Sequence, residues 1–172
     1  MSWPAEPLIH SLLKHVESRA DANAFIGERE SLSYGEFGVM VRAATYRLRR
    51  QGVVRGGRVL LRAPNSPAWA AAYFAVHAVG GIVAPADVDM PIEGVRRQFH
   101  DCGASLVVSC DKLDLGAREI ELAGLCDPAE GGSESEPVCE LDDAADLLFT
   151  SGTSGHKKGV VLTHRQIAQA AT

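Results

Sequence analysis

The chain has 172 residues, which is enough for one domain with a sizeable core. Its composition, 46% hydrophobic and 23% charged, is ordinary for a soluble globular protein. A net charge of −5 argues against binding to nucleic acid through its phosphate backbone.

The predicted elements alternate between helices and strands along the chain. Helices are expected over residues 7–19, 34–51, 67–80, 92–102 and from 164 onward, and strands at 24–26, 31–33, 59–61, 82–84, 106–109, 147–149 and 160–162. Two helix starts carry a capping box, Ser33 with Glu36 and Thr163 with Gln166. Repeated strand–helix–strand units predict an α/β fold with a mostly parallel sheet and helices on both faces.

One apolar stretch is long enough to span a bilayer. Residues 68–86 contain only His77 as a clearly polar side chain. Many of the others are alanines, which are weakly apolar, and Gly80-Gly81 and Pro85 interrupt and end the run. We therefore predict a buried helix followed by a buried strand, and no membrane span.

Charge is distributed unevenly. Residues 42–62 contain seven arginines and no acid, whereas residues 111–146 contain twelve acids. The arginines form either a patch for an anionic ligand or one solvated helix face with strand ends, and we favour the second interpretation. Residues 111–125 remain ambiguous, and residues 127–140 are predicted to form an acidic surface loop.

The cysteines and the N-terminus indicate the compartment. Four cysteines show no C-x-x-C spacing, and no histidine pair has the spacing of zinc ligands. Glu6 and His10 stand where an export signal has its apolar region. We expect a cytoplasmic protein with reduced, mostly structural cysteines.

The segment between Asp146 and His164 carries the strongest chemical signal. An apolar strand runs into a turn rich in glycine and hydroxyl residues, and two lysines and a second apolar run follow. Glycines let successive backbone N–H groups converge on an anion, hydroxyls add donors, and a lysine adds positive charge. The pattern predicts a phosphate-binding loop at the carboxyl end of a strand, where open α/β sheets bind ligands.

Two other interpretations of this loop are less favoured. A flexible Gly/Ser linker would not be framed by two β-type runs. A Walker-type loop does not fit, because Lys157 follows Gly152 at the place where that pattern needs its second glycine. No Ser or Thr follows Lys158 either.

Residues 150–159 resemble the phosphate loop of the adenylate-forming (AMP-binding) superfamily. The pattern of that superfamily is Thr-Ser-Gly-Ser/Thr-Thr-Gly-x-Pro-Lys-Gly, and this chain has Thr-Ser-Gly-Thr-Ser-Gly-His-Lys-Lys-Gly. Ser154 keeps a hydroxyl where threonine is usual. Lys157 replaces the usual proline, so the turn loses a fixed φ and gains a charge.

The resemblance implies roles for these residues. Hydroxyls would donate to the β- and γ-phosphates of ATP, glycines would let backbone N–H groups approach, and Lys158 would neutralise charge. The implied phosphate-binding residues are Thr150, Ser151, Gly152, Thr153, Ser154, Gly155, Lys158 and Gly159. Ser154 is also a candidate contact for Mg²⁺ through phosphate, and Lys157 either assists or is an exposed bystander. No catalytic residue is expected here, because the superfamily has its catalytic lysine further downstream.

The resemblance covers nearly the whole chain. Leu32–Phe37 resembles the first core motif of the superfamily, and residues 52–59 resemble another, with Gly57 in place of an acid. Residues 77–85 resemble the second core motif. We expect these stretches to serve packing and turns.

The implied activity is that of an AMP-forming acid–thiol ligase. A carboxylate attacks the α-phosphorus of ATP to give an acyl-adenylate and pyrophosphate, and the thiol of coenzyme A or of a phosphopantetheine carrier then takes the acyl group. Residues 162–164, Leu-Thr-His, favour an acyl-CoA synthetase of fatty acid metabolism. The alternatives are an adenylation domain of a nonribosomal peptide synthetase, or a stand-alone nucleotide- or partner-binding half of a split enzyme.

Members of this superfamily are several times longer than this chain. Residues 1–172 are therefore expected to be the N-terminal portion of a large AMP-binding domain, with the C-terminal domain absent. The adenine, ribose and carboxylate sites would lie downstream, so we expect this portion alone to be inactive. Its expected partners are a carboxylic acid and the remainder of the enzyme, and an exposed sheet edge would favour self-association.

Overall fold

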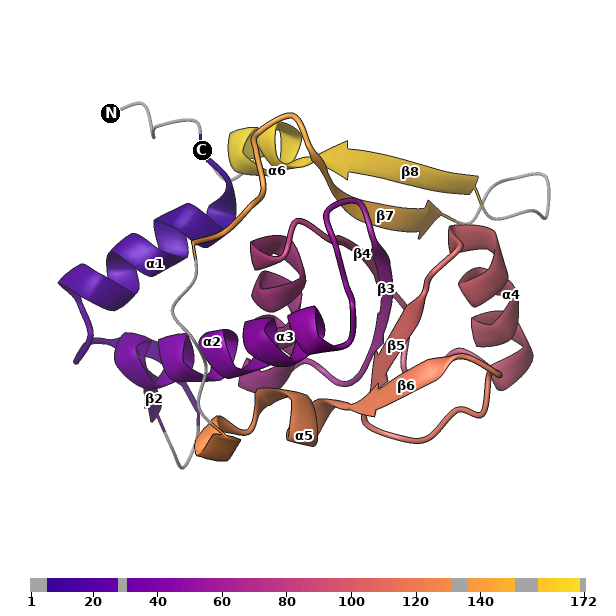
Figure 1. Cartoon of the computed structure of the whole chain (residues 1–172), viewed down its shortest axis with the longest axis horizontal. Helices are drawn as coiled ribbons and strands as arrows, with labels where there is room; N and C mark the ends of the chain where they lie inside the picture. Colours follow the sequence, from indigo (N-terminus) through magenta and orange to yellow (C-terminus); the bar gives the residue numbers. More distant parts are fainter. Residues whose placement is uncertain (1–5, 28–30, 131–135, 151–157, 171–172) are drawn as a thin grey trace.

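The computed structural model describes residues 6–27, 31–130, 136–150 and 158–170, and it has the predicted mixed α/β architecture (Figure 1). The helices are α1 (Leu8–Ser18), α2 (Tyr34–Arg50), α3 (Pro67–Ala78), α4 (Ile92–Cys102), α5 (Leu122–Cys126), the 3₁₀ helix η1 (Pro128–Glu130) and α6 (His164–Ala170). The strands are β1 (Asn23–Ile26), β2 (Ser31–Ser33), β3 (Arg58–Arg62), β4 (Ile82–Pro85), β5 (Leu106–Ser109), β6 (Arg118–Glu121), β7 (Ala144–Thr150) and β8 (Lys158–Thr163).

The main sheet has the strand order β6-β5-β3-β4-β7-β8. The neighbouring pairs from β6 to β7 are parallel, whereas β7 and β8 pair in antiparallel fashion. The strands β1 and β2 form a separate antiparallel hairpin, as predicted. The predicted α/β class and the mostly parallel sheet are therefore confirmed.

The alternation of side chains along β3 divides the core into two layers. Val59 and Leu61 are fully buried against the helices α1, α2, α3 and α5. Leu60, between them, points to the opposite face, where it packs with Val95 and Cys102 of α4. Successive residues of a strand point to opposite faces, so a sheet covered on both sides needs the continuous apolar run that β3 has.

The start of α2 confirms the predicted capping box. The Ser33 hydroxyl accepts a hydrogen bond from the backbone N–H of Glu36 at 3.2 Å, and the Glu36 carboxylate accepts one from the Ser33 N–H at 2.8 Å. These hydrogen bonds lower the pKa of Glu36. Two donors that a helix start leaves unpaired are thus satisfied reciprocally.

We expect Ser33→Ala to lower the free energy of unfolding by about 1 kcal/mol, because it removes this cap. Urea unfolding at neutral pH measures the change. Ser31→Ala, which removes an exposed hydroxyl on β2, is the matched control. An equal loss in the two variants would contradict a role for the cap.

The glycine pair after α3 serves packing. Gly80 has φ +73°, and a Cβ at this position would lie 3.0–3.2 Å from Arg55. A Cβ on Gly81 would lie 3.1 Å from the carbonyl oxygen of Gly57. The loop before β3 and the turn before β4 therefore approach each other closely, and glycine leaves room for this approach. This agrees with the expectation that residues 77–85 serve packing and turns.

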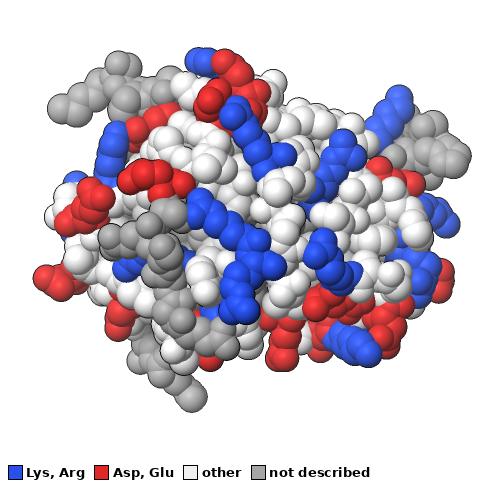
Figure 2. All heavy atoms as spheres, viewed as in Figure 1, with Lys and Arg blue, Asp and Glu red and all other residues white. Residues whose placement is uncertain are grey.

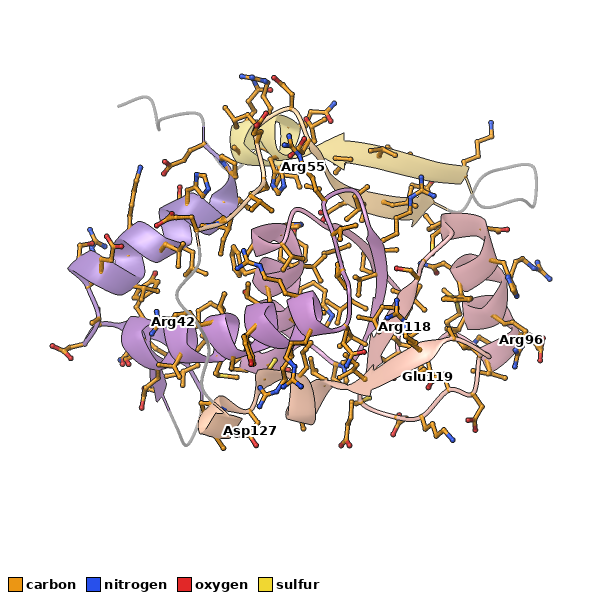
Figure 3. All side chains as sticks on the ribbon, in the orientation of Figure 1. Arg42, Arg55, Arg96, Arg118, Glu119 and Asp127 are labelled. Carbon is orange, nitrogen blue, oxygen red and sulfur yellow. The ribbon has the colours of Figure 1, made fainter. Side chains whose placement is uncertain are left out.

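The arginine cluster has mainly structural contacts. Basic side chains gather across the middle of the view in Figure 2. Arg47, Arg49 and Arg58 donate hydrogen bonds to backbone carbonyl oxygens of distant segments at 2.9–3.1 Å. Arg118 of β6, which Figure 3 labels, likewise donates to the carbonyl of Gln51 at the end of α2. Three of the seven arginines of residues 42–62 thus make contacts that hold distant segments of the fold together.

The stretches with the least regular patterns hold short elements. The ambiguous segment contains β6 and α5, and the acidic loop contains η1. Within that loop Cys139 is buried at 4% exposure, as Cys102 and Cys126 are elsewhere, whereas Cys110 is exposed. The apolar stretch around His77 forms α3 and β4, and in the described segments no helix combines the length and apolarity needed to cross a bilayer.

Candidate functional site

The ends of the predicted phosphate loop lie side by side. Thr150, the last residue of β7, pairs with Lys158, the first residue of β8, and both are exposed. Opposite residues in an antiparallel pair have Cα atoms about 4.5–5.5 Å apart. Residues 151–157, which include the predicted site residues Ser151, Gly152, Thr153, Ser154 and Gly155, lie outside the described residues.

Gly159 allows the strands to approach closely where the loop begins. It pairs with Phe149, and a Cβ on Gly159 would lie 3.1 Å from Leu147 Cδ1 and 3.6 Å from the Phe149 ring. A larger residue would push against these two side chains. We call the β7–β8 hairpin the ribbon. Thr150, Lys158 and Gly159 therefore lie together at the tip of the ribbon.

The ribbon extends beyond its neighbour in the sheet. β7 pairs with β4 at Asp146 and Val83. Two more residues complete β4, at Pro85, whereas four more residues of β7 follow Asp146. Thr150 thus projects past the carboxyl end of β4, toward the edge where parallel α/β sheets bind ligands.

A crevice of about 420 Å³ opens at the same edge, between the loops that follow β3 and β4. The first loop leads to α3 on one face of the sheet and the second leads to α4 on the other, which makes this a topological switch point. Its lining includes Asn65, Trp69 and Asp87. No motif in the sequence indicates a ligand role for these three residues.

A buried polar cluster lies at the base of the ribbon. The Tyr73 hydroxyl donates to Asp146 Oδ2 at 2.9 Å, and His77 Nε2 lies 3.2 Å from Asp146 Oδ1 and 3.3 Å from the Ala145 carbonyl oxygen. Both neighbours are acceptors, so Nε2 carries the hydrogen. Burial, and then the charge of Asp146, raise the pKa of Tyr73 well above its usual range.

His164 completes this cluster from the first turn of α6. Its ring meets the His77 ring edge to face, with centroids 4.7 Å apart, and it is 1% exposed. Burial lowers the pKa of His164 to about 4, and the neighbouring His77 contributes in the same direction. His164 therefore packs inside the fold at the start of α6.

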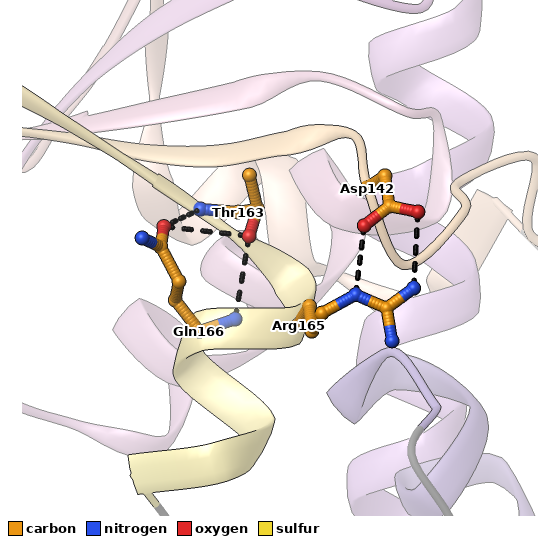
Figure 4. A network of polar contacts seen from close by, with 4 residues as sticks. All are labelled: Asp142, Thr163, Arg165 and Gln166. Carbon is orange, nitrogen blue, oxygen red and sulfur yellow. Dashed lines mark hydrogen bonds and ion pairs between the residues drawn. The ribbon is translucent and has the colours of Figure 1, made fainter.

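The base of the ribbon is also fixed by contacts between the start of α6 and the segment before β7. Thr163 caps α6 through a reciprocal pair of hydrogen bonds with Gln166, as predicted (Figure 4). Arg165 binds the carboxylate of Asp142 through two hydrogen bonds of 2.8 and 3.0 Å. The backbone N–H of His164 donates to the Asp143 carbonyl at 3.1 Å. The start of β7 and the end of β8 are therefore held together.

The described part of the chain offers no metal centre of its own. Within residues 6–27, 31–130, 136–150 and 158–170, no group of three or more His, Cys, Asp or Glu side chains could hold a metal ion. A hard cation such as Mg²⁺ prefers oxygen ligands and usually keeps phosphates in its shell.

Comparison with known proteins agrees with the resemblance seen in the phosphate loop. A plipastatin synthase of Bacillus subtilis (strain 168) is 32% identical over 169 residues, which cover 96% of this chain. Gramicidin S synthase 2 of Brevibacillus brevis is 30% identical over 99% of this chain. The chain spans only 5% and 4% of the lengths of these two relatives.

Solved structures share the fold. The N-terminal subdomain of Klebsiella oxytoca NpsA has a TM-score of 0.88 at 22% identity, over 99% of this chain and 45% of that one. The nonribosomal peptide synthetase FmoA3 has a TM-score of 0.85 at 28% identity, over 99% of this chain and 18% of that one. The profile of the AMP-binding enzyme family matches residues 12–172. This chain belongs to the AMP-binding enzyme family.

Proposed function

We propose that these residues form the N-terminal part of an adenylation domain of a nonribosomal peptide synthetase. Such a domain activates a carboxylic acid with ATP and passes the acyl group to the phosphopantetheine thiol of a carrier domain. The observation that carries the proposal is the Thr150–Gly159 pattern, whose first and last residues the ribbon brings together at the carboxyl edge of the sheet. The sequence relatives support the choice of peptide synthetase.

The proposed mechanism uses the ribbon to stabilise the leaving pyrophosphate. The substrate carboxylate attacks the α-phosphorus of ATP, the bond to the bridging oxygen breaks, and the electron pair leaves with pyrophosphate. Backbone N–H groups and the hydroxyls of Thr150, Ser151, Thr153 and Ser154 would donate to the β- and γ-phosphates, and Lys158 would supply a positive charge. Fixed donors of this kind lower the barrier by electrostatic stabilisation.

Mg²⁺ would accompany the ATP phosphates and neutralise part of their charge. Ser154 is the residue of this chain that we propose as its contact, through phosphate. The adenine, ribose and carboxylate contacts are assigned to sequence outside these residues. Residues 1–172 alone are therefore expected not to catalyse pyrophosphate release that depends on a carboxylate.

Two residues of the Leu-Thr-His segment at 162–164 have local structural contacts. Thr163 caps α6 and His164 packs against His77, so both residues have structural contacts. The preference for acyl-CoA synthetases rested on these residues, and the sequence relatives instead favour the peptide-synthetase alternative. An amino acid or aryl acid is thus proposed as substrate, and a carrier domain rather than coenzyme A as acceptor.

The test is ATP–pyrophosphate exchange in the longest natural form of the protein that carries these residues. We expect exchange that depends on one amino acid or aryl acid, with the acyl group loaded onto a phosphopantetheine carrier. Exchange driven by fatty acids, with transfer to coenzyme A, would favour the acyl-CoA synthetase instead. The absence of exchange with every acid would contradict adenylation.

A further inference from the structure

The buried cluster at the base of the ribbon has a composition that packing alone does not require. Tyr73 and His77 lie four residues apart in an alanine-rich helix, so they share one face of α3. That face meets Asp146, the residue through which β7 pairs with β4. Both carboxylate oxygens of Asp146 thus bind donors from a single helix.

An aromatic row connects this cluster with the crevice. Trp69, which lines the crevice, stacks on Tyr73 with centroids 5.4 Å apart and planes at 14°. Tyr73 then meets His77 edge to face at 4.3 Å, and His77 meets His164 at 4.7 Å. The row therefore runs from the carboxyl edge of the sheet, past the start of β7, to the first residue of α6 after β8.

The cluster lies where it can set the direction of the ribbon. The β7–β8 register is irregular between Ala144 and Asp146, which is where a strand bends and twists more strongly. Thr150 lies four residues, or about 13 Å, beyond Asp146. A small change in angle at Asp146 therefore becomes a displacement of about an ångström or more at the tip, which can cost a reaction about 100-fold in rate.

We propose that His77, with Tyr73, is a positioning residue for the phosphate site: by holding Asp146 it fixes the angle at which the ribbon presents Thr150 and Lys158. His77 does not touch the reacting groups in this arrangement. It acts through Asp146 and through the ring contact with His164. The kinetic consequence rests on the proposed function, whereas the structural consequence does not.

Two substitutions separate positioning from packing. His77→Gln keeps an N–H donor at a similar reach toward Asp146, whereas His77→Leu keeps apolar volume and removes the donor. In the longest natural form of the protein, we expect His77→Leu to lower kcat/KM for ATP about 100-fold, with KM for the carboxylate unchanged. His77→Gln is expected to restore most of this loss.

The matched control is Val107→Ala, which opens a cavity in the layer beneath α4, on the strand β5 that β3 and β4 separate from β7. It is expected to lower the melting temperature while leaving both KM values unchanged. If His77→Leu lowers the melting temperature and changes neither KM nor kcat, the residue only packs and the proposal is overturned. The proposal is also overturned if kcat/KM for ATP is no higher in His77→Gln than in His77→Leu.

Amide hydrogen exchange tests the inference without any assay of activity. We expect His77→Leu to speed exchange selectively in Leu147–Thr150 and Lys158–Val161, compared with Val107→Ala. Uniform acceleration across the sheet would overturn the positioning role. If the wild-type protein shows no ATP–pyrophosphate exchange, the proposed function fails, and the amide comparison still decides whether His77 positions the ribbon.

Discussion

Lys158→Ala is expected to slow adenylate formation by about one to three orders of magnitude, the loss expected for one donor to a developing charge. Lys158 is exposed at the first position of β8, directly opposite Thr150. Its ammonium can therefore reach a ligand held at the ribbon tip without rearrangement of the sheet. ATP–pyrophosphate exchange in the longest natural form of the protein measures the effect. KM for pyrophosphate should rise as well.

Lys112→Ala is the matched control for this experiment. Lys112 is an exposed lysine that pairs with Asp114 at 2.9 Å on the segment after β5. Its removal changes the net charge by the same amount and should leave exchange unchanged. Lys158→Arg keeps the charge in a different geometry and is expected to fall between the wild type and Lys158→Ala. A wild-type rate in Lys158→Ala would remove this lysine from the mechanism.

His164 is expected to make the fold sensitive to acid. Burial lowers the pKa of its imidazole from 6.5 to about 4, because the charged ring would lose its hydration and would lie against His77. Asp143 and Asp146 act in the opposite direction but do not outweigh burial. The unfolded chain therefore takes up the proton at a higher pH than the folded chain does.

The sign and size of this effect follow from linkage. The contribution of the neutral His164 ring to the free energy of unfolding is fully present above pH 6.5. It is lost as the pH falls toward the folded pKa of about 4. The difference corresponds to about 3 kcal/mol of unfolding free energy. Urea unfolding at about pH 7 and at about pH 4 should show a smaller loss in His164→Leu than in the wild type.

His100→Gln serves as the control, because it removes an exposed imidazole on α4 instead. The wild type and both variants carry the same acidic residues, so the comparison between variants cancels the contribution of those residues. If His164→Leu and the wild type lose equal stability between the two pH values, His164 does not couple to folding in the proposed way.

Sequence patterns within a few residues predicted the helices that begin with a capping box and the strand with a continuous apolar run. Ser33 and Glu36 marked the start of α2, and Thr163 with Gln166 marked the start of α6, because the hydrogen bonds of a cap involve residues close in sequence. The continuous apolar run at β3 likewise indicated a strand covered on both faces. These features depend on neighbours within a few residues.

β6 and the direction of β8 were harder to predict. β6 reads Arg-Glu-Ile-Glu with only Ile120 apolar, and it joins the sheet through backbone pairing with β5. β8 runs antiparallel to β7, although the pattern suggested a mostly parallel sheet. Residues 151–157 are too few for the crossover that parallel neighbours need, so loop length was the signal that could have predicted it.

The buried cluster could not be derived from the sequence. His77 and Asp146 are 69 residues apart, and nothing local indicates that they pair. His77 stood out only as the single clearly polar residue in an apolar stretch. Its role depends on the packing of α3 against β7, which becomes visible only when the sheet order is known.

The most direct test of the proposed phosphate site is amide hydrogen exchange in the peptide that covers residues 146–163, with and without ligand. We expect magnesium pyrophosphate and ATP to slow exchange in this peptide and adenosine to leave it unchanged, because the proposed contacts are made by phosphates alone. Protection by adenosine, or protection elsewhere with none in this peptide, would contradict a phosphate site at the tip of the β7–β8 ribbon.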